Sequence, residues 1–71
     1  MHATDAKIAG WVHLVRAEYI EMPGLNLTRP QIQRLWSLDA ADCDAVLEAL
    51  IARRFLKPMR GNAFVRADGR V

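Results

Sequence analysis

Two helix-start signals, at Thr28 and at Asp39, constrain the fold of this chain more than any other feature of its sequence. The Thr28 hydroxyl can accept a hydrogen bond from the backbone N–H of Gln31, and the Gln31 side chain can reach back to the N–H of Thr28. Pro30 suits the same first turn, where its missing N–H removes no hydrogen bond. Asp39 is a second N-cap. The helix that begins at Thr28 must therefore end and turn, at Ser37-Leu38, before the next helix begins.

Apolar side chains recur at helical spacing on both sides of this turn. They predict a first helix over about 4–21, which must end before Pro23-Gly24, a second over about 29–36 and a third over about 40–53. The buried stripes comprise Ile8, Trp11, Val12, Val15 and Tyr19 in the first helix, Ile32, Leu35 and Trp36 in the second, and Cys43, Val46, Leu47, Leu50 and Ile51 in the third.

From Phe55 onward the pattern changes to two short extended runs separated by Arg60-Gly61-Asn62. Glycine and asparagine tolerate the positive φ of hairpin turns, so we expect a β-hairpin over about 55–66. With a loop at Gly61-Asn62, one face of the hairpin holds Leu56, Pro58 and Val65, and the other holds Lys57, Met59, Phe64 and Arg66. Pro58 belongs on an outer strand, because proline cannot donate to a sheet. Leu25-Asn26-Leu27 alternates like a very short strand.

Length and composition fit one small globular domain over residues 1–71. A hydrophobic fraction of 52% with 25% charged residues is typical of a folded chain, and 71 residues are too few to form two cores. We expect a mainly α fold with a small β-hairpin. Such a small core gains stability from a nucleic-acid partner or from a homodimer. Trp11 and Trp36 nevertheless fit the core better than a dimer interface, because large aromatic residues at helical spacing are mostly buried.

The only cysteine, Cys43, bears on both location and chemistry. It excludes an internal disulfide and favours a reducing, cytoplasmic location, and no apolar run approaches the roughly 20 residues that cross a bilayer. Cys43 lies on an apolar stripe, so we expect a buried, unreactive thiol. His2, His13 and Cys43 have no partner at metal-ligand spacing, and no nucleophile is paired with a base. We expect no metal, no cofactor and no enzymatic activity.

Positive charge collects at the C-terminal end of a chain whose formal net charge is +2. Six of the ten Lys and Arg residues lie from Arg53 onward, against Asp68 as the only acidic residue there. Such a cluster is typical of a surface that binds an anionic partner, and it is about as typical of a solvated basic tail. The charge distribution alone does not distinguish the two.

The order helix, short strand, helix, tight turn, helix and hairpin resembles the winged helix-turn-helix. The stretch Leu27-Thr28-Arg29-Pro30-Gln31-Ile32-Gln33-Arg34-Leu35-Trp36-Ser37-Leu38-Asp39 resembles the first helix and turn of that motif in bacterial regulators of the MarR and ArsR kind. Leu47, Leu50 and the Arg54-Phe55-Leu56 junction resemble the end of the recognition helix and the first strand of the wing. The resemblance covers residues 25–66 and implies three helices plus a two- to three-stranded wing. It departs at Arg54, where these families usually have a glycine, so we expect this helix to end differently.

The resemblance implies DNA as the partner of a small transcriptional regulator. The candidate DNA-binding residues are Thr28, Arg29 and Arg34 on the second helix, Ala41, Asp44 and Arg53 on the third, and Lys57, Arg60, Asn62 and Arg66 on the hairpin. Before Arg53 the third helix has no Arg, Lys, Asn or Gln, the donors that read base edges, so we expect contacts with the phosphate backbone. The acidic, alanine-rich third helix also supports an alternative, a protein-interaction domain of the same fold that does not bind DNA.

Overall fold

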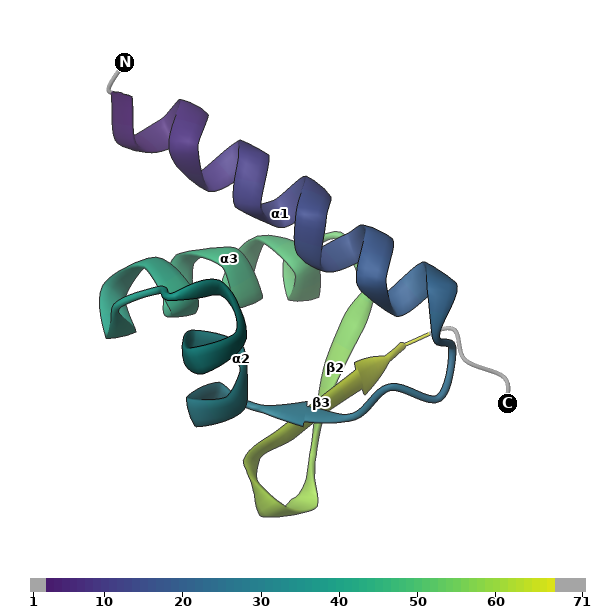
Figure 1. Cartoon of the computed structure of the whole chain (residues 1–71). Helices are drawn as coiled ribbons and strands as arrows, with labels where there is room; N and C mark the ends of the chain where they lie inside the picture. The colour runs from purple at the N-terminus through teal and green to yellow at the C-terminus, as the bar shows by residue number, and fades with distance from the viewer. Residues whose placement is uncertain (1–2, 68–71) are drawn as a thin grey trace.

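The computed structural model describes residues 3–67 and shows three helices beside a small antiparallel sheet (Figure 1). The helices are α1 (Ala3–Glu21), α2 (Arg29–Trp36) and α3 (Ala40–Ala52), and the strands are β1 (Leu27–Thr28), β2 (Leu56–Met59) and β3 (Ala63–Arg66). The mainly α fold with a small β-hairpin is confirmed, and the predicted helix bounds lie within one residue of those observed.

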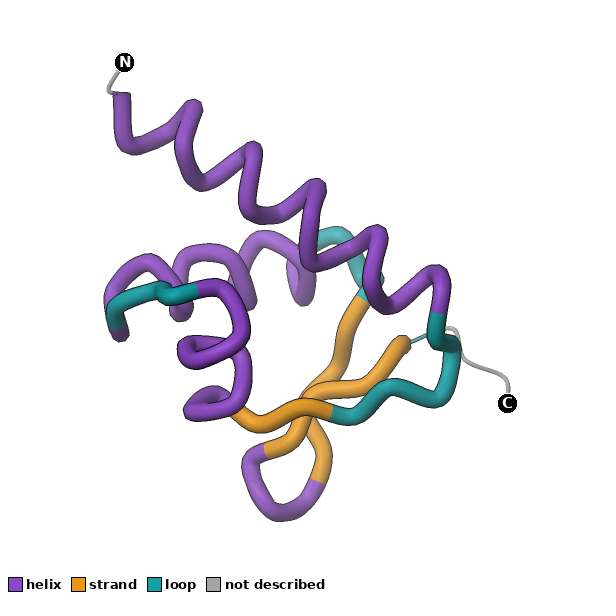
Figure 2. Tube along the Cα trace, viewed as in Figure 1, coloured by secondary structure: helices purple, strands orange, loops and turns teal. Residues whose placement is uncertain are grey.

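The sheet has the strand order β1-β3-β2, so β2 is an edge strand and the outer position expected for Pro58 is confirmed (Figure 2). The predicted register of the hairpin is wrong by one residue. Met59 pairs with Ala63, and Pro58 pairs with Phe64, because the loop is the three-residue 3-10 turn Arg60–Asn62. Within this turn Gly61 and Asn62 have positive φ values of 75° and 63°. The shift moves Phe64 from the face of Lys57 to the buried face of Leu56.

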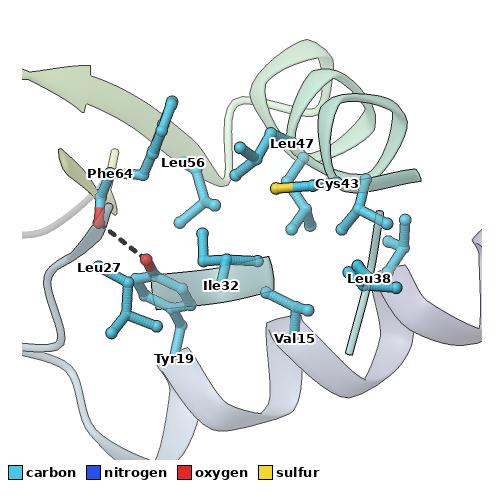
Figure 3. Close-up of a cluster of buried hydrophobic side chains, with 12 residues drawn as sticks. Val15, Tyr19, Leu27, Ile32, Leu38, Cys43, Leu47, Leu56 and Phe64 are labelled. Carbon is cyan, nitrogen blue, oxygen red and sulfur yellow. Dashed lines mark hydrogen bonds between the residues drawn. The ribbon is translucent and has the colours of Figure 1, made fainter. Parts of the chain in front are cut away.

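The buried side chains of the described residues form a cluster enclosed by α1, α2, α3 and the sheet (Figure 3). Its members are Val12, Val15, Tyr19, Leu27, Ile32, Leu38, Cys43, Val46, Leu47, Leu50, Leu56 and Phe64. Trp11 and Trp36 pack against this cluster and are partly buried, which confirms their expected core role. The burial expected for Leu35 is wrong, since its side chain is 61% exposed. Ile32 points into the core from this eight-residue helix, whereas Leu35 lines an open surface depression.

Tyr19 links α1 to the sheet. Its side chain is fully buried, and its hydroxyl donates a 2.8 Å hydrogen bond to the backbone carbonyl of Phe64 in β3 (Figure 3). Burial raises the pKa of Tyr19 from 10.0 to about 12, against a smaller opposing effect of the Leu27 backbone. A neutral hydroxyl satisfies this site, whereas a tyrosinate would be a charge inside the core.

The ends of α2 and α3 follow the predicted capping signals. Thr28 and Gln31 form the reciprocal capping box at the start of α2, and the Asp39 carboxylate accepts a 2.8 Å hydrogen bond from the N–H of Asp42 at the start of α3. Ser37, with φ 55°, closes α2 in the left-handed conformation and leads into the short connection to α3. Both predicted helix starts are therefore confirmed.

The end of α3 was expected to differ because Arg54 replaces the usual glycine, and this expectation is wrong. Arg54 itself adopts the left-handed conformation, with φ 60°. Its N–H donates to the carbonyl of Ile51, and the N–H of Phe55 donates to the carbonyl of Leu50, both at 2.9 Å. These are the two hydrogen bonds of a glycine-type helix end, made here by a residue whose Cβ disfavours the conformation.

Replacing this residue should therefore stabilise the domain. We expect Arg54→Gly to raise the free energy of unfolding by about 0.5–1 kcal/mol, because glycine adopts positive φ without a Cβ clash. Urea denaturation measures the change. Arg53→Gly is the matched control, since it removes the same charge at φ −86° and should give no stabilisation. Equal effects of the two variants would contradict the assignment of strain to Arg54.

The only tyrosine of the chain, Tyr19, offers a direct spectroscopic test of the core. Tyrosinate absorbance in native protein should appear around pH 12 and not around pH 10, because the folded state holds the neutral hydroxyl. Since the folded pKa lies above the unfolded one, the associated stability is complete below pH 10 and is lost as pH rises toward 12. Tyr19→Phe should lack this component of alkaline unfolding. Ionisation of the native protein at the ordinary pKa would contradict a buried hydroxyl.

Candidate nucleic-acid interface

The start of α2 and the hairpin loop are neighbours. β1 runs directly into α2, and Thr28 of β1 pairs with Ala63, which follows the loop Arg60–Asn62 (Figure 1). This pairing brings the start of α2, with Arg29, to the loop that holds Arg60 and Asn62, 31 and 33 positions away in the chain. We refer to Arg29 at the start of α2, Arg60 and Asn62 in the loop, and Lys57 on the edge strand β2 as the hairpin edge. All four side chains are exposed, and Lys57 lies across β3 from β1.

Within this edge Arg29 is already engaged by another candidate residue. Its Nε donates to the Asp44 carboxylate of α3 at 2.7 Å, and its guanidinium carbon lies 5.3 Å from the centre of the Phe64 ring. Both side chains are exposed, so the pair contributes at most about 1 kcal/mol. Its larger effect is electrostatic, because Asp44 neutralises the one cation at the start of α2.

The outward face of α3 carries no base-reading donor. Ala41, Asp44, Glu48 and Ala52 are exposed along it, whereas Ala45 is half-buried. Asp42 turns the other way and pairs with Lys7 of α1 at 3.3 Å. Glu48 and Asp44 thus place carboxylates where a helix in the major groove would approach phosphates.

The C-terminal cations do not form one patch, because they lie on different parts of the hairpin. Arg60 lies in the loop, and Lys57 pairs with Val65 on the face of the sheet opposite Leu56. Arg66 pairs with Leu56 at the end of the ladder away from the loop. There the Arg66 guanidinium lies 5.1 Å from the centre of the Phe55 ring, and Arg16 of α1 lies 5.3 Å from the same ring. The structure therefore separates Arg66 from the hairpin edge. No sequence signal relates Arg16 to Phe55, which lie far apart in the chain.

The other candidates have different surroundings. The Thr28 hydroxyl lies 3.2–3.3 Å from the Gln31 oxygen and N–H, so the helix cap occupies it. Arg34 borders an open apolar depression of about 290 Å³ that Leu27, Gln31 and Leu35 complete. Arg53 is exposed at the C-cap of α3, at the opposite end of the helix from Asp39. These residues do not join the hairpin edge.

The thiol of Cys43 lies inside the core. Cys43 is fully buried as expected, and burial first, with Asp44 second, raises the pKa of its thiol. In the part of the chain that the structure describes, no three His, Cys, Asp or Glu side chains are grouped closely enough for a metal ion. His2 lies outside the described residues. No helix among residues 3–67 has the length and apolar character needed to cross a bilayer.

Comparison with known proteins gives no match to a family model, to a curated protein or to a solved structure. The function of the domain is therefore inferred from the arrangement of its own residues.

Proposed function

We propose that this domain is a DNA-binding winged helix-turn-helix module that grips the phosphate backbone through its hairpin edge. The observation that carries the proposal is the exposure of Lys57 and Arg60 on a hairpin beside the start of α2. Phosphate oxygens accept hydrogen bonds from such cations without regard to base sequence. The second helix, its left-handed turn at Ser37 and α3 supply the helix-turn-helix half of the module.

The acidic face of α3 limits what this module can read. Sequence discrimination needs Arg, Lys, Asn or Gln side chains at base edges, and the described outward face of α3 offers alanines and carboxylates. We therefore infer weak, sequence-tolerant binding in which the hairpin supplies most of the attraction. A base-specific regulator of this fold would need additional contacts from outside α3.

Charge reversal on the hairpin tests the proposal. At low salt we expect Lys57→Glu with Arg60→Glu to reduce affinity for a mixed-sequence duplex by at least about 100-fold, because two attractive contacts become repulsive. Fluorescence anisotropy of a labelled duplex measures this change. The control is Arg34→Glu with Arg53→Glu, which changes the net charge equally on surfaces away from the hairpin edge. Equal losses in both variants would show that the net charge alone governs DNA binding, and would contradict a binding site on the hairpin.

The Arg29–Asp44 pair allows a test by gain of binding. We expect Asp44→Asn to strengthen DNA binding roughly fivefold at low salt, because it removes a carboxylate and releases the Arg29 guanidinium toward phosphate. Asp42→Asn is the matched control. It removes the same charge from the same helix and also breaks an ion pair, but its partner Lys7 lies on α1. If the two variants gain equally, Arg29 has no specific role in binding.

One observation favours a second function, that of a protein-interaction domain. The exposed face of α3 combines alanines with Asp44 and Glu48, a smooth acidic surface suited to a basic protein partner. This alternative predicts no DNA binding even at low salt, so the same titration distinguishes it from the first proposal.

A further inference from the structure

The outer face of α1 is apolar and uncovered. α1 lies across the molecule with α3 and the sheet on its inner side only (Figure 1). On the opposite side Leu14 is 49% exposed, and Gly10 and Ala17 are exposed beside it. Ile20, 45% exposed, lies on a neighbouring stripe with His13. A helix with apolar residues on both faces is normally buried on both. The outer face therefore has the character of an interface.

The residues of this outer face follow the spacing of a helix-pairing seam. Lys7, Gly10, Leu14, Ala17 and Glu21 are separated alternately by three and four positions, the repeat by which two helices pack along one line. A Cβ atom on Gly10 would meet nothing within 4 Å, so this part of the seam is open. Gly10 and Ala17, one on each side of Leu14, leave room for the side chains of a second helix.

The charges at the two ends of the seam identify the occupant and its direction. Lys7 and Glu21 are equally distant from Leu14 in the sequence, seven positions on either side. In an antiparallel pair of α1 helices centred on Leu14, each Lys7 meets Glu21 of the second copy, and the two leucines meet at the centre. A parallel pair would instead place like charges together. We propose that α1 binds α1 of a second copy of this chain, antiparallel and centred on Leu14.

The existing ion pair of Lys7 is compatible with this arrangement. Lys7 lies 3.3 Å from Asp42 but remains 59% exposed, and its ammonium group has three donors. It can therefore bridge Asp42 of its own chain and Glu21 of the second copy. The pairing is independent of the DNA proposal, because the seam lies on α1 and the hairpin edge on β2, its loop and α2.

The size of the seam sets the expected affinity. A 19-residue helix is about 28 Å long, and one helix pair buries less than the standard interface of about 1,600 Å². We therefore expect a dimer that dissociates at roughly micromolar concentrations.

Sedimentation equilibrium of the full chain, from about 5 to about 500 µM, tests the proposal. The wild type should shift from monomer to dimer, and Leu14→Glu should weaken association at least about 100-fold, because it places two carboxylates at the centre of the seam. Leu35→Glu is the control for surface hydrophobicity, since Leu35 is more exposed than Leu14 but lies on α2. A monomeric wild type, or a dimer lost in Leu35→Glu and kept in Leu14→Glu, would overturn the proposal. Circular dichroism establishes that each variant is folded.

A charge exchange tests the direction of the pair and does not depend on Leu14. Lys7→Glu and Glu21→Lys should each self-associate more weakly than the wild type, because like charges then meet at both ends of the seam. An equimolar mixture of the two variants should associate as well as the wild type, since every end contact then joins opposite charges. Unchanged self-association of Glu21→Lys, or no recovery in the mixture, would reject the antiparallel register.

Discussion

The burial of Tyr19, with its hydroxyl bonded to the Phe64 carbonyl, is the contact on which the arrangement of this domain depends. It joins the longest helix to the central strand of the sheet, elements that stand at opposite ends of the sequence. Tyr19 also packs edge-on against Phe55, which lies in the connection between α3 and β2, with ring centres 6.4 Å apart. In so short a chain one side chain thus fixes α1, the start of the hairpin and β3 relative to one another. The pairing of β1 with β3 then sets the hairpin beside the start of α2.

Ion pairs and aromatic contacts on this frame engage several of the cations of the domain. Asp42 and Asp44 of α3 hold Lys7 and Arg29, so two cations are drawn into internal pairs on opposite sides of the helix. Aromatic stacking places Arg16 and Arg66 around Phe55. Lys57 and Arg60 remain exposed on the hairpin, beside the capped start of α2. Only part of the positive charge in the C-terminal sequence therefore contributes to the hairpin edge. We propose contacts between this edge and the phosphate backbone, and no reading of bases by α3.

Local signals in the sequence predict much of the fold, because capping and periodicity act within a few residues. The capping box at Thr28 and the cap at Asp39 place α2 and α3 correctly, and the proline of β2 correctly indicates an edge strand. Features that depend on tertiary contact were missed. A single loop residue, Arg60, decides which side of the hairpin faces the core. The exposure of Leu35, on the same helix as the buried Ile32, does not follow from its apolar spacing. The candidate site also combines local and tertiary features. Its residue types can be read from the sequence, whereas the pairing of Arg29 with Asp44, 15 positions away, cannot.

We propose that the hairpin edge binds phosphates through a small number of cations. The dependence of wild-type affinity on salt concentration tests this most directly, because each neutralised phosphate releases counterions. Two contacts, from Lys57 and Arg60, predict a slope of about −1.8 in a plot of log affinity against log salt concentration for duplex DNA. Binding whose affinity does not change with salt, or no binding at low salt, would contradict the account and leave the acidic face of α3 as the functional surface.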